Sequence, residues 1–396
     1  MRIKKDLYQG RVLSIDAMRG ITILVMIFVN ELAGVSDVPL WMKHMPADAD
    51  GMTFVDLVFP GFLFIVGMSV PFAFNARLIK GDSVWGIWKH TCQRALALIV
   101  MGVYMVNAEY GYDESRMVIS ASLWAFFAYS LPIPIWNKYK RNFPIVWKNT
   151  LQYGGMIGLL ILYFLYVRDD GQVGLIAKWW GILGLIGWAY LFSVIVYWLV
   201  NGDVKLLTIF FLLCIGVSCT ASATSISIQD QFWFEFSAIH LTHASIVSAG
   251  VIVSLLFFEK GKDVRVHWSV IGFTILLLVM GYLLRPYFGV SKIRATPSWC
   301  LYSSALCTVM YYFLYELMEC KKRVAWSSFF MPAAANPLLI YILPGIIIYF
   351  NLSIGLRLTP DYFTRGVPGI LWCAVFSVLM VFLMKVFNRI NIRLHL

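Results

Sequence analysis

Residues 53–75 read TFVDLVFPGFLFIVGMSVPFAFN, and this stretch decides the fold. One acid, Asp56, stands near its start, and an almost unbroken apolar run follows. A helix needs about 20 such residues to cross the hydrocarbon core of a bilayer. Thr53 can cap that helix, with Asp56 at its third position, which is the arrangement of a capping box. The stretch therefore predicts a membrane-spanning helix whose first turn is fixed by its own side chains.

Similar apolar runs, each bounded by charged or turn residues, recur along the chain. They fall near 12–33, 53–75, 94–108, 117–136, 149–167, 175–200, 204–223, 238–258, 266–285, 299–318, 329–350 and 366–388. Of the 396 residues, 60% are hydrophobic and 13% are charged, whereas soluble domains carry roughly 25% charged residues. The sequence therefore predicts an all-α polytopic membrane protein with about 12 transmembrane helices, forming a single domain over 1–396. A soluble enzyme, a disordered chain and a disulfide scaffold are excluded.

The positive charge of the chain is arranged in alternate loops. Lys and Arg number 32 against 21 Asp and Glu, which gives a net charge of +11. The cations of these loops and of the two ends are Arg2, Lys4, Lys5, Arg11, Arg77, Lys80, Lys89, Lys138, Lys140, Arg141, Lys148, Lys260, Lys262, Arg265, Lys321, Lys322, Arg323, Arg389 and Arg393. This pattern is typical of cytoplasmic loops, so we expect both termini in the cytoplasm and no nucleic-acid partner. The segment 285–298 is an exception, because it places Arg285, Lys292 and Arg294 on the predicted outer side.

The cysteines and histidines do not predict a metal site. The seven cysteines form no CxxC pair and lie mostly inside apolar runs, where cysteine behaves as a small hydrophobic residue. His240 and His243 stand three residues apart and share a helix face, but no acid or cysteine recurs beside them. We therefore expect a packed or hydrogen-bonded pair of histidines, and no metal.

Polar side chains inside the first predicted span are candidates for function, because such groups are costly in lipid and usually face a cavity or one another. Asp16 and Arg19 are three residues apart and can pair on one face of the helix. A local ion pair explains them at least as well as catalysis does. Asn30 stands near the other end of the span, where an amide is more typical of hydrogen bonding between helices than of catalysis.

Two polar residues further along the chain are also candidates. His44 lies in the loop 34–52, and imidazole is the side chain whose proton moves near neutral pH. An isolated loop histidine is nevertheless more often ordinary than catalytic. Asn336 lies in a run that Pro332, Pro337 and Pro344 interrupt. Broken membrane helices are tolerated where they line a cavity, so we expect Asn336 in a pocket.

Residues 11–30 read RVLSIDAMRGITILVMIFVN, and residues 56–67 read DLVFPGFLFIVG. With His44 between them, these stretches resemble the heparan-alpha-glucosaminide N-acetyltransferase family and its bacterial relatives. The family pattern runs Asp-x-x-Arg-Gly, an apolar helix ending in Asn, a loop His and then Asp-Leu-Val-Phe-Pro, and all five features stand here in order. The resemblance is strong over about 11–75 and weaker over 332–341.

The resemblance implies transfer of an acetyl group from cytoplasmic acetyl-CoA to an amino sugar or glycan on the outer side. His44 would take the role of the family's active histidine, as a general base or as a residue that carries the acetyl group, with Asn30 beside it. The residues that would bind substrate or cofactor are Asp16, Arg19, Asp56, Arg94 and Asn336. Ten helices would form the family core, and two helices within 175–223 would be additional.

The chain departs from the family pattern at two places. The fourth helix has LWA at 123–125 where the family has a Gln-Arg pair, and the broken helix is followed by ILP at 342–344 where the family has Gly-His-Glu. These departures leave the acceptor open. Only Asn201, Gly202 and Asp203 separate the two halves of 175–223, so its division into two spans is open too.

Two other classes of protein fit the hydropathy. A secondary transporter of a small polar solute would also have about 12 helices, cytoplasmic termini and broken helices. A membrane scaffold or channel module would need no special geometry at His44 or Asn30. Binding of acetyl-CoA separates the acetyltransferase from both. The expected location is a bacterial inner membrane, the expected partner is the lipid bilayer, and a homodimer is left open.

Overall fold

The computed structural model describes residues 4, 7–177, 179–223, 232–259 and 264–394, and within them it is helical with only isolated β-bridges. The prediction of an all-α polytopic membrane protein is confirmed. Side chains of 232–237, 264 and 265 are not part of this description. Four of the cations that predict the topology, Arg2, Lys5, Lys260 and Lys262, lie outside the described residues, as does the side chain of Arg265.

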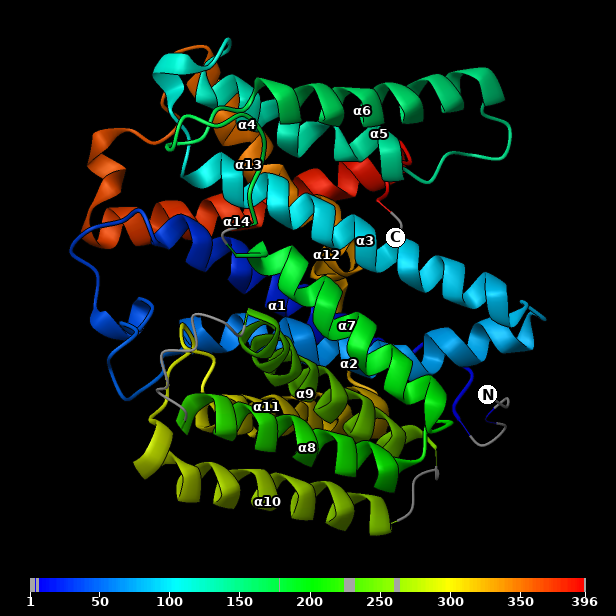
Figure 1. Ribbon diagram of the computed structural model, residues 1–396. Coiled ribbons are helices and arrows are strands. Elements are labelled where there is room, and N and C mark those ends of the chain that lie inside the picture. Colours follow the sequence, from blue (N-terminus) through cyan, green and yellow to red (C-terminus); the bar gives the residue numbers. More distant parts are fainter. Residues whose placement is uncertain (1–3, 5–6, 178, 224–231, 260–263, 395–396) are drawn as a thin grey trace. The chain divides into compact units, whose positions relative to one another are not determined.

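Figure 1 shows the helices in their order along the chain. The α-helices are α1 (Leu13–Leu32), α2 (Phe54–Ile79), α3 (Val84–Glu109), α4 (Ala121–Ser130), α5 (Pro132–Trp136), α6 (Ile145–Leu165), α7 (Gly181–Leu199), α8 (Val204–Ala223), α9 (Phe232–Phe258), α10 (Val264–Phe288), α11 (Pro297–Tyr315), α12 (Met331–Ala335), α13 (Pro337–Ser353) and α14 (Gly366–Arg389). Short 3-10 or π turns are η1 (Leu40–Met42), η2 (Glu114–Arg116), η3 (Glu316–Cys320), η4 (Ala325–Phe329) and η5 (Asp361–Thr364).

Each predicted apolar run corresponds to helix. The run 175–223 forms two helices, α7 and α8, because Asn201 and Gly202 adopt φ values of 52° and 66° and turn the chain. The run 329–350 is divided into α12 and α13 at Asn336, next to the helix-starting Pro337. Proline at the first helical position has no amide hydrogen to leave unsatisfied, so it begins a helix well.

Eight helices of the described part are long and apolar enough to cross a bilayer. They are Leu13–Leu32, Phe54–Ile79, Val84–Glu109, Gly181–Leu199, Val204–Ala223, Ala238–Phe258, Val266–Phe288 and Gly366–Arg389. Two shorter apolar helical segments, Ala121–Trp136 and Pro337–Ser353, add to them. The total of about 12 spans and the cytoplasmic position of both termini stay predictions.

The packing divides the chain into two compact units. The first comprises Met1–Thr22, Pro39–Ala95 and Ile186–Ser327, and the second comprises Ile23–Val38, Leu96–Leu185 and Ser328–Leu396. Helices α1, α3 and α7 contribute residues to both units. The expectation of a single domain over the whole chain stays a prediction.

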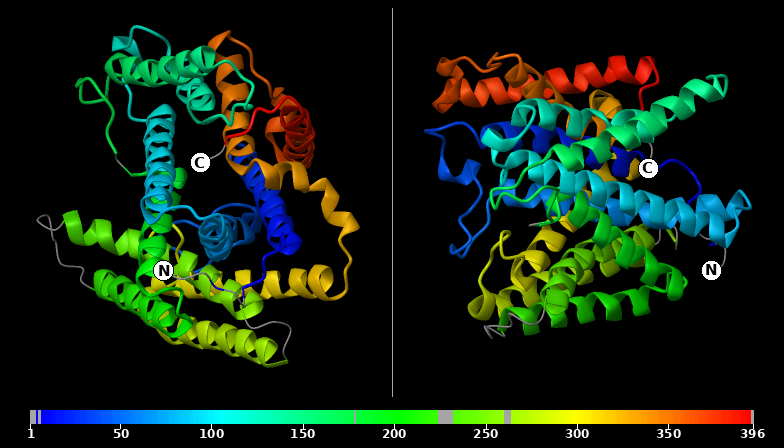
Figure 2. Two further views of the ribbon diagram at one scale, coloured as in Figure 1. Left: turned by 90° about the vertical axis from the view of Figure 1, so that its right-hand side faces the viewer. Right: turned by 45° about the horizontal axis from the view of Figure 1, so that its top comes forward.

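Within the first unit, α9 is the central helix. It packs against α2 and against α8, while α11 packs on α9, α2 and α10 (Figures 1 and 2). Helix α9 is buried along almost its whole described length. Its Thr242, Ser245 and Ser254 hydroxyls donate to backbone carbonyls, Ser254 to that of Met68 at 3.0 Å. Within the second unit, α4 packs on α13, α5 on α6, and α12 on α14.

Candidate functional site

His44 and Asp56 form a hydrogen-bonded pair in the first unit. The imidazole Nδ1 of His44 lies 2.7 Å from the Asp56 carboxylate oxygen Oδ1. The Asp56 side chain is 1% exposed, whereas that of His44 is 40% exposed. A buried carboxylate therefore orients a histidine whose other edge remains accessible. A carboxylate that holds an imidazole in one tautomer in this way is typical of a catalytic histidine that acts as a base.

Asp56 is itself held by the first turn of α2. Its second oxygen, Oδ2, accepts hydrogen bonds from the backbone amides of Thr53 at 3.0 Å and Met45 at 3.2 Å. Thr53 caps the helix by accepting from the amide of Val55, and its hydroxyl donates to the carbonyl of Lys43 at 2.8 Å. The predicted capping box is confirmed. Its bonds leave Oδ1 for His44, so one carboxylate both caps α2 and orients the imidazole.

Lys292 is a third member of the site, and sequence reasoning missed it. Its ammonium nitrogen Nζ lies 3.3 Å from Nε2 of His44 and 3.4 Å from Nδ1. The Asp56 carboxylate can only accept, so the neutral ring carries its proton on Nδ1 and donates it to Asp56, which leaves Nε2 as the acceptor for Lys292. This tautomer is assigned from the partners of the ring. Burial lowers the pKa of Lys292, while the Asp56 carboxylate acts in the opposite direction.

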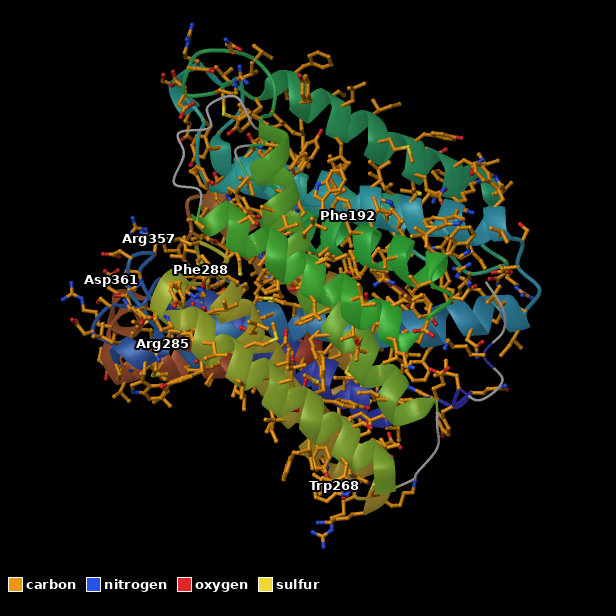
Figure 3. The ribbon with its side chains drawn as sticks, turned by 60° about the horizontal axis from the view of Figure 1, so that its bottom comes forward. Phe192, Trp268, Arg285, Phe288, Arg357 and Asp361 are labelled. Atoms are coloured by element: carbon orange, nitrogen blue, oxygen red, sulfur yellow. The ribbon has the colours of Figure 1, made fainter. Side chains whose placement is uncertain are left out.

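The segment that carries Lys292 is joined to the His44 loop by several hydrogen bonds. Asp50 accepts from the Arg285 guanidinium at 3.0 Å and from the Val290 amide at 2.8 Å. The Ser291 hydroxyl donates to the carbonyl of Ala47 at 3.0 Å. Arg285 stands near the end of α10, where the chain enters this segment (Figure 3). The two stretches thereby form one platform that brings Lys292 to His44.

The predicted intramembrane ion pair is present and larger than expected. Asp16 accepts from Arg19 at 2.8 Å and from Arg11 at 2.6 Å. The second guanidinium nitrogen of Arg19 donates to the Ser69 hydroxyl of α2 at 2.8 Å. Arg94 lies over the ring of Tyr190, 4.8 Å from its centroid, and its charge also acts on Arg19. Three arginines and one aspartate thus leave a positive cluster, which suits the phosphates of a nucleotide.

Helix α2 connects the two groups of side chains. Asp56 is in its first turn, and Ser69 follows 13 residues later (69 − 56), which at a rise of about 1.5 Å per residue is about 20 Å along the axis. The histidine pair therefore lies at the start of α2, and the arginine cluster meets the same helix in its middle.

The remaining predicted site residues have other surroundings. Asn30 is exposed and belongs to the second unit, so its predicted position beside His44 stays a prediction. Asn336 is fully buried in the second unit, where its amide donates to the carbonyl of Ile392 at 2.9 Å and accepts from the amide of Leu394 at 3.2 Å. These bonds fix the C-terminal segment, and the predicted pocket role of Asn336 is untested.

The histidine pair of α9 is packed, as predicted. His243 is 3% exposed and lies edge-on to Phe59 and Trp299, and His240 is 1% exposed beside Trp188. In the part of the chain that the structure describes, no three or more His, Cys, Asp or Glu side chains form a group that could hold a metal ion.

Comparisons with known proteins add two findings. The family model described as "Domain of unknown function (DUF5009)" matches residues 11–242. The chain is also 37% identical to the heparan-alpha-glucosaminide N-acetyltransferase of Homo sapiens over 101 residues, which are 25% of this chain and 14% of that protein. It is 35% identical to the Mus musculus protein of the same name over 102 residues, which are 26% of this chain and 15% of that protein. The resemblance inferred from the sequence motifs is confirmed, over a small part of those longer relatives.

Proposed function

This chain belongs to the DUF5009 family, and we propose that it is a transmembrane acetyltransferase that passes an acetyl group from acetyl-CoA to an amino sugar or glycan on the other side of the membrane. The observation that carries the proposal is the His44–Asp56 pair at the start of α2, with an arginine cluster about 20 Å along the same helix. A bacterial inner membrane stays the expected location.

The arginine cluster would bind the phosphates of CoA. Arg94 and Arg19 offer guanidinium groups, which pair with phosphate oxygens in a bidentate manner. The pantetheine arm of CoA is long and thin, so it can carry the thioester towards His44 while the nucleotide stays at the cluster. Asp16 would keep Arg19 and Arg11 in place through its two ion pairs.

Two chemical routes are compatible with the histidine pair. In the first, Nε2 of His44 takes the proton of the attacking amine as the new C–N bond forms and the C–S bond breaks, and the proton then goes to the CoA thiolate. In the second, Nε2 attacks the thioester carbon and CoA leaves as the thiolate, after which the amine displaces the imidazole and gives up its proton, which balances the thiolate. In both, Asp56 stabilises the imidazolium or acyl-imidazolium through Nδ1–H.

Lys292, which donates to Nε2 in this structure, would turn to the charge that develops at the thioester oxygen and thereby leave Nε2 free to react. Both routes pass through a tetrahedral intermediate whose oxygen is negatively charged, and a preorganised donor lowers its free energy. The Lys292 ammonium is 3.3 Å from Nε2, the atom at which the reaction would occur. Asn30, which the family resemblance assigns to the mechanism, stays a predicted donor to the same oxygen.

The test uses the purified full-length protein in detergent with acetyl-CoA labelled in the acetyl group and a panel of amino sugars and hydroxylated glycans. We expect labelled product with at least one amine. His44→Ala should abolish transfer and leave CoA binding intact. The matched control is His267→Ala, because this imidazole contacts Tyr312 and Glu316 instead. Near-normal turnover by His44→Ala would remove His44 from the mechanism, and absence of acetyl-CoA binding by the wild type would favour a transporter.

The nucleotide site is tested separately with Arg94→Gln. We expect the KM for acetyl-CoA to rise about tenfold, which corresponds to about 1.4 kcal/mol. Acetyl-pantetheine lacks the nucleotide phosphates, so its KM should not change. Arg294→Gln, at an exposed arginine beside the Lys292 segment, is the control. An equal effect of Arg94→Gln on both thioesters would show that this arginine does not bind the nucleotide.

A further inference from the structure

A cavity of about 230 Å³ lies in the second unit at the end of α1. Glu31 is its acidic wall, and Trp372 and Phe376 of α14 form an aromatic wall. Ile348 and Leu352 of α13 add aliphatic surface. The loop after α13 closes another side with Arg357, which stands on the same loop as Asp361 (Figure 3). Most of the lining is therefore apolar, and its two charged residues are Glu31 and Arg357.

The Glu31 carboxylate has no protein partner in the described part of the chain: no hydrogen bond or ion pair involves it, and Arg357, which lines the same cavity, forms none with it. The contrast with Asp16 at the other end of α1 is direct, because Asp16 is paired with both Arg11 and Arg19. A carboxylate among apolar walls is costly unless a cation neutralises it. The missing partner is thus a positively charged group of small size.

We propose that this cavity binds a primary ammonium group, with Glu31 as its counter-ion and Trp372 as the surface on which the ligand body rests. The aromatic face attracts a cation and packs against the apolar face of a sugar ring. A volume of about 230 Å³ is below the range of drug-sized pockets, which begins at roughly 300 Å³, and so it suits a single amino sugar or an ethanolamine group.

Two sources of this ammonium group are chemically equivalent at the site. One is a free amino sugar, in which case the cavity captures the acceptor, and this alternative rests on the proposed function. The other is the headgroup of phosphatidylethanolamine from the surrounding bilayer. Binding of an ammonium group to Glu31 does not depend on acetyl transfer, so the binding experiment is informative even if no acetyltransferase activity is found.

The experiment measures binding of radiolabelled glucosamine to the full-length protein in nanodiscs by equilibrium dialysis, without acetyl-CoA. Glucosamine should bind, whereas glucose and N-acetylglucosamine, which have no ammonium group, should not compete. Glu31→Gln should weaken glucosamine binding at least tenfold. Asp361→Asn removes an acid from the loop that carries Arg357 and should leave binding unchanged. Leu352→Trp keeps Glu31 but fills the cavity, so it should also abolish binding.

The lipid source is tested by comparing nanodiscs of phosphatidylcholine alone with nanodiscs that contain phosphatidylethanolamine. If the lipid occupies the site, phosphatidylethanolamine should compete with glucosamine in the wild type, and native mass spectra should show a retained lipid that Glu31→Gln loses. If the acceptor occupies it, Glu31→Gln should raise the KM for the amine acceptor without lowering kcat. The proposal would be overturned if Glu31→Gln and Leu352→Trp both bound glucosamine and phosphatidylethanolamine as tightly as the wild type does.

Discussion

Asp56 uses its two carboxylate oxygens for different purposes. Oδ2 satisfies the amides of Thr53 and Met45, and Oδ1 accepts from His44. The first function belongs to the helix and the second to the site, so a change at Asp56 can be designed to keep one and lose the other. Because the side chain is 1% exposed, water cannot replace a missing partner.

Asp56→Asn separates these two functions. The amide oxygen can still accept from the Thr53 and Met45 amides, and the NH2 group then faces Nδ1 of His44 as a donor. This reverses the tautomer and places the proton on Nε2, where the base is needed. We expect kcat to fall by roughly two to four orders of magnitude, as when the carboxylate of a catalytic triad is replaced. Steady-state kinetics measure the fall in kcat, and circular dichroism shows whether the helix content is kept.

The matched control is Asp48→Asn, at an exposed acid of the same loop. It should keep both kcat and the thermal midpoint. A loss of helix content in Asp56→Asn equal to its loss of activity would assign Asp56 to the fold alone.

Lys292 gives the site a pH dependence that stability measurements can detect. Burial lowers the pKa of Lys292 below the ordinary value for lysine, which is about 10.4 in the unfolded chain. Between these two pKa values the unfolded state binds more protons than the folded state, so the free energy of unfolding rises with pH there. Below the lowered pKa the cost of desolvating the partly buried ammonium is fully present.

Lys292→Met removes the ammonium group, so the free energy of unfolding of this variant should lack the rise with pH that Lys292 causes. We expect the thermal midpoint of the wild type to increase relative to Lys292→Met as the pH is raised from 7 towards 10.4. Differential scanning fluorimetry at several pH values measures the difference. Lys43→Met, in the loop that carries His44, is the control that shows how much another lysine contributes to the pH dependence of the thermal midpoint. If the difference in thermal midpoint between the wild type and Lys292→Met did not change with pH, the folded protein would not disfavour the charged form of Lys292.

At the scale of helices, the crossing of α2 and α9 depends on two glycines. A Cβ atom on Gly67 would lie 1.9 Å from the carbonyl oxygen of Val247, and one on Gly250 would lie 2.0 Å from the carbonyl oxygen of Phe64. Each glycine therefore meets the backbone of the other helix. Without a hydrophobic effect between helices in lipid, such close contact is a main source of association.

Gly67→Ala and Gly250→Ala should each lower the free energy of unfolding by about 1–3 kcal/mol, because the backbone atoms that the new Cβ meets cannot move aside as a side chain would. Gly216→Ala in α8 and Gly272→Ala in α10 are matched controls, since a Cβ at either position would meet nothing within 4 Å. These controls should be neutral or slightly stabilising, because alanine favours helix over glycine by about 1 kcal/mol. Unfolding in mixed detergent measures all four variants, and equal effects would refute the close-packing account.

Helices were predictable from the sequence because each is encoded locally. The apolar runs located them, and the capping box located the start of α2 at Thr53. The division of 175–223 stayed open in the sequence, and the positive φ values of Asn201 and Gly202 show where α7 and α8 separate. Lys292 was not predictable, because its contact with His44 joins residues far apart in the chain. The available signal was the positive charge of 285–298, of which Arg285 pairs with Asp50 and Lys292 contacts His44.

The same distinction holds for the candidate site. The motifs identified His44 and Asp56 separately, and the capping box gave Asp56 a role in the helix. A carboxylate has two oxygens, however, and the local pattern accounts for the bonds of Oδ2 only. The cavity at Glu31 could not be predicted either, because its walls come from α1, α13, α14 and the loop after α13.

For the whole molecule, the proposed reaction requires two faces of a membrane. Acetyl-CoA is made in the cytoplasm on the family interpretation, and the His44 loop is predicted to lie outside. The predicted inner loops end in clusters of cations, of which Lys321, Lys322 and Arg323 follow the exposed Cys320. If the distribution of Lys and Arg sets the orientation, then Cys320 and the loop that carries Asp48 lie on opposite faces.

A membrane-impermeant maleimide tests this arrangement in intact cells that express the protein. Asp48→Cys places a thiol in the exposed part of the His44 loop, and this thiol should be labelled without permeabilisation. Cys320 should be labelled only after the membrane is opened, and Cys320→Ser identifies its signal in peptide mass spectra. Labelling of both positions from the same side would place donor and acceptor sites on one face. Transfer across the bilayer would then be unnecessary, and the arginine cluster would have to bind something other than a cytoplasmic thioester.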